Sequence, residues 1–472
     1  MAGITSFGAY VPFHRLNRDE LARAWEARTG GGQKAVASYD EDSVTMAVAA
    51  GLDCLKGLDA KKIEGIFLAT TTSPYREKQA ATIVATAVDC PREAFNADIT
   101  DSVRSGSIAM NFALDAIESG RTKSIMVTVS DCRLGAPRGE FESLLGDGAA
   151  ALLFGDSDVV ASVQGRYSIS NEILDVWKAD KDAYLRSWED RFVITQGYNK
   201  TVREAVQGLL KKYKLGPKDF AKVILYAPDT RSHMALAKAL GFDPKTQVQD
   251  SLIGAIGHAG AAAPLMMLVA ALEEAKPGDR LLFASYGDGS DAFVLQVTEN
   301  INKLRNGRGV KKYLQSKTVP INYEKYLLWK GQIQVEPPRR LEPLVPSASA
   351  LYRERKEILA LYGQRCRRCG TVQYPPQRIC VECYGRGEFD DYKFADKKAK
   401  VFTFAKEQTT AILEQPKIMC VIDFEGGGRM QTEVADRDPD EIKVGLQVEM
   451  TFRKLQDLKG IHHYFWKCKP VR

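Results

Sequence analysis

Short apolar runs alternate with amphipathic segments through the first 300 residues. The runs Gly3–Tyr10, Gly65–Ala69 and Ser124–Val129 predict buried strands, and apolar residues at helical spacing between them predict helices. Strands that are apolar on both faces are typical of a sheet covered by helices on both sides. The same alternation recurs after residue 165, so the chain is predicted to contain a duplicated α/β unit with halves 1–165 and 166–300.

The stretch Asn96–Met110 carries the clearest functional pattern in the chain. A short apolar strand is followed by a polar turn and then by a helix with apolar residues at helical spacing. Many α/β enzymes mount a nucleophile at such a turn, because the helix N-terminus stabilises its anionic form. The residue presented here is Val103, between Ser102 and Arg104, and valine has no nucleophilic atom. The pattern predicts the frame of an acyl-transfer enzyme without its usual attacking group.

The last third of the chain has a different pattern. Residues 301–350 are rich in basic residues and then in proline, which predicts an extended linker. A charged helix and a cysteine cluster occupy residues 351–392. Five short strands separated by turns fill residues 393–472, and they predict a small all-β barrel.

Four of the nine cysteines lie in one cluster with metal-ligand spacing. Cys366-x2-Cys369 and Cys380-x2-Cys383 are separated by ten residues, and each pair offers two thiolates to the tetrahedral zinc of a zinc ribbon. The alternative is four free or redox-active cysteines. A closed four-cysteine shell leaves no open coordination position, so the predicted zinc is structural. The remaining cysteines are scattered, which favours a reducing, cytoplasmic compartment over a disulfide framework.

Charge and hydropathy narrow the possible partners. The net charge is +6 and basic residues are interleaved with acidic ones, which does not by itself indicate nucleic acid or a membrane surface. No apolar run is long enough for a transmembrane helix, and the N-terminal residues lack the pattern of a secretory signal. A zinc ribbon beside a small barrel also fits a nucleic-acid-binding module. The barrel, however, lacks an aromatic and basic stripe and carries acidic residues, so nucleic acid is the less favoured partner.

Several motifs of the first 300 residues resemble the thiolase superfamily, and specifically its 3-hydroxy-3-methylglutaryl-CoA synthase branch. The matching strings are DEDSVTM (Asp40–Met46), SPYREK (Ser73–Lys78), DITDSVRSG (Asp98–Gly106), AKPGDR (Ala275–Arg280) and SYGDGSDAF (Ser285–Phe293). The resemblance implies a five-layered α-β-α-β-α fold, a tight homodimer and acyl-CoA as the substrate class.

The segment from Ala350 to the C-terminus resembles the zinc-ribbon and OB-fold family that is often encoded beside thiolases. The matching strings are CRRCG (Cys366–Gly370), YPPQRIC (Tyr374–Cys380) and EGGGR (Glu425–Arg429). In that family the module is usually an accessory piece that bridges or completes thiolase-type enzymes. The resemblance therefore implies an OB-fold barrel in residues 393–472 and a separate thiolase subunit as partner.

The catalytic positions of the synthase branch depart from the family pattern. By motif position its Glu falls at Thr71, its Cys at Val103 and its His at Tyr226. An Asn that normally follows the glycine of a late helix is His258 here, in a Gly-His-x-Gly string similar to that of degradative thiolases. Val103 cannot form an acyl-enzyme, and Thr71 cannot supply a carboxylate base. Both are therefore predicted to contact the substrate rather than to react with it.

His258 and Tyr226 form the predicted acid/base and oxyanion pair, with backbone amides near Gly287 and Gly289 as further donors. Such a set can polarise a thioester carbonyl and support a step without covalent catalysis, such as retro-aldol cleavage of a β-hydroxyacyl-CoA. Alternatives stay open. Tyr226 also fits a buried structural tyrosine, His258 a helix-start histidine, and Cys132 a substitute nucleophile.

Three hypotheses for function follow from these features. In the first, the chain is an acyl-CoA C–C bond enzyme without a cysteine nucleophile, working in a thiolase- or aldolase-type complex. In the second, it is a catalytically silent subunit that scaffolds a separate Cys-bearing thiolase. In the third, it is a nucleic-acid-binding zinc-ribbon and barrel module.

Overall fold

The structure is a computed structural model that describes residues 2–28, 30–304, 307–336, 347–408 and 413–472. Contacts within the chain define two compact units. Unit 1 comprises Met1–Ala37, Asp42–Ala85 and Cys90–Ser316, and unit 2 comprises Ser38–Glu41, Thr86–Asp89 and Lys317–Arg472. The main boundary between the units therefore falls inside the segment 301–350.

Unit 1 is built on nine strands that repeat one topology twice. In sheet order they are β11 (Lys222–Leu225), β12 (Arg280–Ala284), β13 (Gly289–Val297), β8 (Ala161–Ser170), β1 (Gly3–Tyr10), β7 (Gly148–Gly155), β6 (Ser124–Asp131), β4 (Gly65–Ala69) and β5 (Phe95–Ile99). In the first half β1, β7 and β6 pair antiparallel, and β4 and β5 extend them in parallel. In the second half β8, β13 and β12 pair antiparallel, and β11 extends them in parallel. The repeated pattern is that of a duplicated α/β unit.

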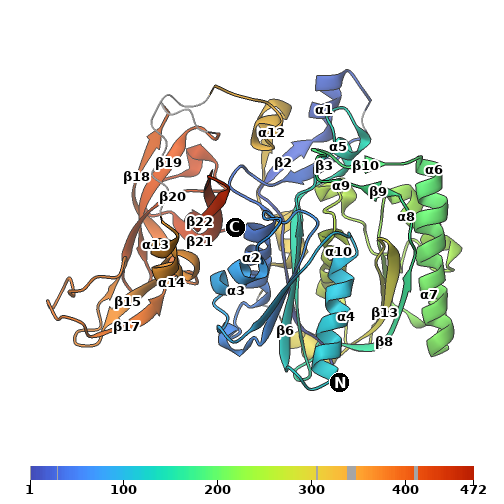
Figure 1. Cartoon of the computed structure of the whole chain (residues 1–472), viewed down its shortest axis with the longest axis horizontal. Helices are drawn as coiled ribbons and strands as arrows, with labels where there is room; N and C mark the ends of the chain where they lie inside the picture. Colours follow the sequence, from blue (N-terminus) through green and yellow to red (C-terminus); the bar gives the residue numbers. More distant parts are fainter. Residues whose placement is uncertain (1, 29, 305–306, 337–346, 409–412) are drawn as a thin grey trace. The chain divides into compact units, whose positions relative to one another are not determined.

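Helices cover both faces of this sheet (Figure 1). α2 (Ser43–Cys54) packs against β1, β7 and β6, on the side of β6 opposite to α4 (Ser105–Glu118). α10 (Ala262–Glu274) contacts strands of both halves, and α7 (Lys200–Tyr213) packs against β13 and β8. The buried residues of α10 are apolar around most of its circumference, as in a helix enclosed on several sides. Helix and sheet layers therefore alternate, as the predicted α/β fold requires.

The remaining elements of unit 1 are short and mostly connect the strands. They are β2 (His14–Asn17), α1 (Arg18–Trp25), β3 (Gln33–Val36), η1 (Ala60–Lys62), α3 (Ala81–Ala87), α5 (Glu140–Leu144), β9 (Val176–Trp177), β10 (Arg186–Ser187), α6 (Asp190–Phe192), the π-helix η2 (Val193–Asn199), η3 (Pro217–Asp219), α8 (Thr230–Ala239), α9 (Ile253–Ile256), η4 (Glu299–Lys303) and α11 (Gly309–Gln315). Over the described ranges, no helix has both the length and the apolar character needed to cross a bilayer.

The segment 301–350 is more structured than the extended linker expected from its composition. Unit 1 contains α11, and unit 2 contains β14 (Val319–Ile321), α12 (Tyr323–Trp329) and the start of α13 (Ala348–Arg353). The reason is a set of large side chains that the basic residues obscure: Val310, Tyr313, Tyr323, Tyr326 and Trp329 are all buried. Residues 337–346, which hold most of the prolines, lie outside the described residues.

Unit 2 contains a three-stranded ribbon and a five-stranded barrel. α14 (Arg355–Ala360) leads into β15 (Tyr362–Cys366), which pairs with β16 (Val372–Gln373) and β17 (Phe389–Lys393). The barrel strands run in the order β20 (Arg429–Glu433), β19 (Lys417–Phe424), β18 (Lys398–Glu407), β21 (Gln447–Leu458) and β22 (Ile461–Pro470), and η5 (Pro439–Glu441) precedes β21. A bridge between Val434 and Cys468 links the two ends of this order. The predicted all-β barrel is confirmed.

Candidate active site

The turn that joins β5 to α4 packs against the turn that precedes β13. A Cβ atom built on Gly287 would lie 2.8 Å from Cγ2 of Val103, and Gly287 has a φ of 146°, so only glycine fits there without strain. Ser102 Oγ donates a hydrogen bond of 2.8 Å to the carboxylate of Asp288, which ties the two turns together. Val103 therefore occupies the strand–turn–helix corner with an aliphatic side chain held in a close contact.

The side chain of Thr71, in the loop after β4, is held by a buried carboxylate. Asp131, at the end of β6, has an exposed fraction of 0%. Its Oδ2 accepts hydrogen bonds from the Thr71 hydroxyl at 3.0 Å and from the Ala261 N–H at 2.7 Å. Its Oδ1 accepts from the Thr71 N–H at 2.7 Å and from the hydroxyls of Thr70 and Thr72 at 3.0 and 3.1 Å. The Thr71 hydroxyl is thus committed to Asp131, which links the β4 loop to the segment before α10.

His258 lies in the break between α9 and α10, beside Tyr226 at the end of β11. The ring centroids are 5.2 Å apart, and the rings meet edge to face. His258 Nδ1 accepts a hydrogen bond of 3.1 Å from the Gly260 N–H, so the neutral ring carries its proton on Nε2. Burial lowers the pKa of His258 to about 3, which keeps the ring neutral near pH 7. Nε2 is buried and has no hydrogen-bond partner among the described residues, so His258 has an unsatisfied N–H donor.

Tyr226 belongs to a cluster of three tyrosines. Its ring centroid lies 6.1 Å from that of Tyr198 and 5.6 Å from that of Tyr286. The Tyr198 hydroxyl donates to the Tyr226 carbonyl at 2.6 Å, and the Tyr286 hydroxyl donates to the Asp175 carboxylate at 2.5 Å. Burial raises the pKa of Tyr226 to about 12, and burial also raises the pKa of Asp175. Tyr226 is therefore protonated at neutral pH, while Asp175 is more basic than an exposed carboxylate.

Two adjoining cavities bring most of the predicted site residues together. The first, of about 490 Å³, is lined by Thr71, Val103, Tyr226 and Gly287. The second, of about 800 Å³, shares Tyr226 with the first and contains His258. Gly289, at the start of β13, is not brought to either cavity. A side chain there would meet the backbone of β8 and the guanidinium of Arg104.

The cavities contain further polar groups that sequence reasoning did not single out. Asp175 and Tyr286 line the first cavity, and Arg133 lines both. Tyr286 lies in the string SYGDGSDAF, but a motif match does not reveal its bond to Asp175, which lies 111 positions away. Cys132 also lines the first cavity, and its N–H donates to the Thr72 hydroxyl at 3.1 Å. Its alternative role as a substitute nucleophile therefore needs a chemical test.

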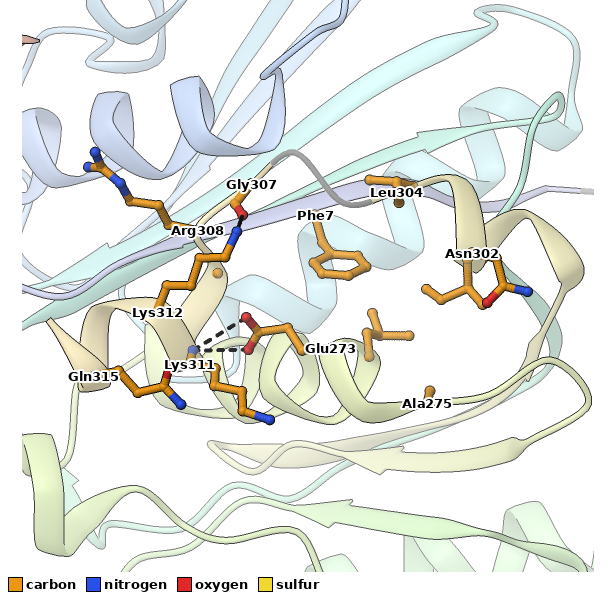
Figure 2. Close-up of a pocket in the computed structure, with 13 residues that line it drawn as sticks. Phe7, Glu273, Ala275, Asn302, Leu304, Gly307, Arg308, Lys311, Lys312 and Gln315 are labelled. Atoms are coloured by element: carbon orange, nitrogen blue, oxygen red, sulfur yellow. Dashed lines mark hydrogen bonds between the residues drawn. The ribbon is translucent and has the colours of Figure 1, made fainter. Parts of the chain in front are cut away.

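A third cavity, of about 450 Å³, is formed by α10, α11 and neighbouring segments and contains none of the predicted site residues (Figure 2). The Glu273 carboxylate accepts hydrogen bonds of 3.2 and 3.3 Å from the Lys311 N–H, and Lys312 Nζ donates to the Gly307 carbonyl at 3.0 Å. Burial raises the pKa of Glu273 to about 7. Two polar side chains of this cavity, Glu273 and Lys312, hold the start of α11, and we assign the cavity no catalytic role.

Unit 2 contains the candidate metal centre. The Sγ atoms of Cys366, Cys369, Cys380 and Cys383 all lie within 4.8 Å of one another. The closest pairs, Cys366–Cys383 and Cys369–Cys380, are 3.6 and 3.5 Å apart. Tetrahedral zinc with Zn–S bonds of about 2.3 Å requires sulfur atoms about 3.8 Å apart, so the four thiols fit zinc. All four ligands come from the protein, which is the composition of a structural site.

The repeated topology of unit 1 and its corner at Val103 define a protein of the thiolase-fold class. The crystal structure of an HMG-CoA synthase complexed with CoA has a TM-score of 0.64 at 19% identity, over 72% of this chain and 91% of that one. The 3-oxoacyl-[acyl-carrier-protein] synthase III of Aquifex aeolicus VF5 has a TM-score of 0.55 at 22% identity, over 63% of this chain and 100% of that one.

Sequence relatives specify the family within this class. The hydroxymethylglutaryl-CoA synthase of Methanocaldococcus jannaschii is 32% identical over 346 residues, which are 71% of this chain and 100% of that protein. The hydroxymethylglutaryl-CoA synthase of Pyrococcus horikoshii is 32% identical over 333 residues, 69% of this chain and 94% of that protein. The chain therefore belongs to the hydroxymethylglutaryl-CoA synthase family.

Family models match three segments of the chain. Residues 210–297 match the model described as 3-oxoacyl-[acyl-carrier-protein (ACP)] synthase III C terminal. Residues 353–390 match "ChsH2, rubredoxin-like zinc ribbon domain", and residues 392–453 match "ChsH2, C-terminal OB-fold domain". The zinc-ribbon and OB-fold prediction for the C-terminal part is thereby confirmed.

Proposed function

We propose that unit 1 binds an acyl-CoA and makes or cleaves a C–C bond without forming a covalent acyl-enzyme. A CoA thioester as substrate is supported by the names of the relatives and by two similar structures, one complexed with CoA and one with 3-hydroxy-3-methylglutaryl coenzyme A. The non-covalent route is supported by the aliphatic side chain of Val103. The observation that carries the proposal is the buried, unpaired Nε2–H of His258 beside Tyr226, in the wall of the second cavity.

In the cleavage direction the substrate is a β-hydroxyacyl-CoA. Asp175, held by Tyr286, accepts the proton of the β-hydroxyl group. The bond between the α and β carbons breaks, its electron pair passes to the α carbon and the thioester oxygen, and a carbonyl compound leaves. His258 Nε2–H donates to the enolate oxygen, and the Tyr226 hydroxyl protonates the α carbon. The proton on Asp175 then passes through solvent to the Tyr226 anion, which restores both groups, so the shortened acyl-CoA gains one proton for the one that the β-hydroxyl group lost.

The protonation states of the site support these roles. Burial keeps His258 neutral, with a pKa of about 3, so it acts as a hydrogen-bond donor and never as a cationic acid at neutral pH. Burial raises the pKa of Tyr226 to about 12, which makes it the acid, and it raises the pKa of Asp175, which makes it the better base. Burial raises both pKa values, so Tyr226 stays the weaker acid that is protonated at neutral pH, and Asp175 is a stronger base when it is ionised.

The test is deuterium exchange into the methyl group of acetyl-CoA, with the full-length protein in D₂O and detection by mass spectrometry. This exchange is the protonation step in reverse, so its rate should rise with pH as the Tyr226 anion forms. His258→Ala and Tyr226→Phe are each expected to slow exchange about 100-fold, while CoA binding measured by calorimetry is retained. His258→Asn should keep part of the rate, because an asparagine can accept the Gly260 N–H and still donate.

The control variant is His233→Asn. His233 is another fully buried histidine, but it does not line either cavity, so its replacement should leave exchange unchanged. CoA binding without exchange in the unaltered protein would favour the silent-subunit hypothesis. An acyl adduct on Cys132, found by intact-mass and peptide analysis, would replace the non-covalent route with a covalent one.

We also propose that the chain forms a homodimer through β5. This strand is at the edge of the nine-stranded sheet, so its outer backbone groups are available to pair with a second copy. Phe95 in β5 and Phe112 in α4 are 44% and 54% exposed. Light scattering should give twice the chain mass, and Phe112→Glu should shift the protein toward the monomer. Leu58→Glu, at another exposed apolar residue, is the control.

We further propose that a separate thiolase subunit associates with this chain. Because Val103 has no sulfur, a cysteine-dependent acyl transfer in the same assembly would have to occur on another polypeptide. The ChsH2 family models that match unit 2 describe zinc-ribbon and OB-fold modules of the kind expected in such an assembly. Identification of the proteins that co-purify with the untagged chain tests this. A Cys-bearing thiolase in equal amount would support it, and a pure homo-oligomer would contradict it.

A further inference from the structure

Arg133 is a cation of the cavities to which the proposed mechanism gives no role. It follows β6 and lines both the first and the second cavity. Its side chain makes no hydrogen bond or ion pair with any residue that the structure describes, and its Nε atom is buried. The buried Nε has lost hydration without compensation, whereas the terminal nitrogens are not among the buried atoms and face the cavities. The guanidinium of Arg133 is therefore available to an anionic ligand.

The stem of Arg133 is fixed beside His258. A Cβ atom built on Gly260 would lie 2.8 Å from Arg133 Cδ, and the Gly260 N–H is the donor that holds His258 Nδ1. Burial has the largest influence on the pKa values of Tyr226 and His258, and the charge of Arg133 comes second, lowering both. Arg133 is therefore within electrostatic reach of both members of the pair.

The other charged groups of the cavities do not neutralise Arg133. Asp175 is hydrogen-bonded to Tyr286, and the other carboxylates that line the cavities form no ion pair with Arg133. The remaining cations of the cavities, Lys178, Arg191 and Arg231, are exposed. Arg133 is thus the cation that lies deepest among the groups lining these cavities.

Three side chains with unused donors therefore share the wall around Tyr226. They are the Arg133 guanidinium, the His258 Nε2–H and the Tyr226 hydroxyl, which has no hydrogen bond to a described residue. All three groups are hydrogen-bond donors in the protonation states described above, so the ligand atom that they bind must be an acceptor. The positive charge of Arg133 favours an acceptor that carries negative charge. The thioester oxygen of an enolate has this property.

We propose that Arg133 is a catalytic residue whose guanidinium, together with His258, binds the thioester oxygen as it becomes an enolate. The inference rests on the proposed function. It adds a full positive charge at the atom where the electron pair of the broken C–C bond accumulates. Stabilisation is greatest where charge develops, so Arg133 acts on the rate of the chemical step more than on substrate binding.

The test uses the acetyl-CoA exchange assay with variants at position 133. Arg133→Gln should lower the maximal exchange rate about 100-fold and leave the KM for acetyl-CoA within about threefold. Arg133→Lys should retain an intermediate rate, because it keeps the charge but not the planar fork. Added methylguanidinium should restore part of the rate of Arg133→Ala. Arg203→Gln, which removes an exposed charge from α7, is the control.

The pH profile gives a readout that a purely structural role would not move. Loss of the Arg133 charge should raise the pKa of Tyr226 and move the exchange profile to higher pH. Asp175 influences the pKa of Tyr226 in the opposite direction, so Asp175→Asn should move the profile to lower pH.

The outcomes separate this inference from the proposed function. Exchange by the unaltered protein with an undiminished rate in Arg133→Gln overturns the inference alone. A rise in KM without a change in maximal rate also overturns it, because Arg133 would then bind the ground state. Absence of exchange in the unaltered protein overturns both.

Discussion

Replacing Asp131 with alanine is expected to destabilise unit 1 and to loosen two segments that form the cavities. The buried carboxylate accepts five hydrogen bonds, two of which come from the backbone N–H groups of Thr71 and Ala261. These groups lie far apart in the sequence, one after β4 and the other immediately before α10. In the alanine variant both lose their acceptor, the Ala261 N–H in the buried interior and the Thr71 N–H at a half-buried position beside the first cavity.

The magnitude follows from the groups that are left unpaired. A buried N–H without an acceptor costs about 1–3 kcal/mol and a half-buried one costs less, so Asp131→Ala should cost about 2–4 kcal/mol in the free energy of unfolding. The threonine hydroxyls can rotate toward other acceptors and add little. In Asp131→Asn, the carbonyl oxygen can replace Oδ1, but the amide group then faces the Ala261 N–H. One N–H is left unpaired, so the cost should be about 1–3 kcal/mol.

Urea denaturation, followed by circular dichroism, measures the free energy of unfolding of each variant. Hydrogen exchange with mass spectrometry should show faster exchange in peptides that contain residues 70–72 and 259–262. Asp156→Ala, which removes an exposed carboxylate, is the control. If Asp131→Ala unfolded at the same urea concentration as this control, the carboxylate would not be what holds the two segments.

Three further predictions concern pH and metal. The pKa of His258 is about 3 in the folded chain against an ordinary 6.5, so between these values the unfolded state binds more protons. The free energy of unfolding should therefore fall as pH drops below about 6.5. In urea titrations, His258→Asn should reduce that fall between pH 7 and pH 5. The pKa of Glu273 is about 7 against an ordinary 4.5, so stability should fall as pH rises between these values, and Glu273→Gln should flatten the dependence in the same titrations. A zinc chelator, or Cys380→Ser, should abolish hydrogen-exchange protection in residues 362–393, while strands β19 and β21 keep theirs; elemental analysis should give one zinc per chain before treatment.

Much of the fold was predictable because it depends on patterns that the sequence displays locally. The apolar runs correspond to β1, β4 and β6, and the cysteine spacing corresponds to the ribbon. The segment 301–350 was predicted less well, since lysines and prolines conceal the aromatic residues of α12, of which Trp329 donates a hydrogen bond to the Leu413 carbonyl, 84 positions away. A composition average cannot detect a few large side chains that a tertiary contact buries.

The candidate site was predictable where a motif marks it and not elsewhere. His258, Tyr226, Val103 and Thr71 were found from strings of neighbouring residues, and the structure brings them to two adjoining cavities. Arg133 has no such string, and its distinguishing property is the absence of a partner, which appears only when its surroundings are known. A missing contact in three dimensions leaves no trace in spacing or periodicity.

Thr71, Val103 and Tyr226, the positions at which the resemblance implies a replaced catalytic residue, all line the first cavity. Thr71 donates both its N–H and its hydroxyl to Asp131, so a glutamate at position 71 would bring a second carboxylate against a fully buried one. Two such charges in contact cannot both be ionised without a large cost, and a protonated glutamate is no base. A cysteine introduced at position 103 alone would therefore lack both partners that the resemblance implies, a carboxylate base at position 71 and an imidazole at position 226. The environment of Asp131 thus opposes a return to cysteine chemistry through any single substitution, which is why we place the chemistry of this cavity in the donors that remain.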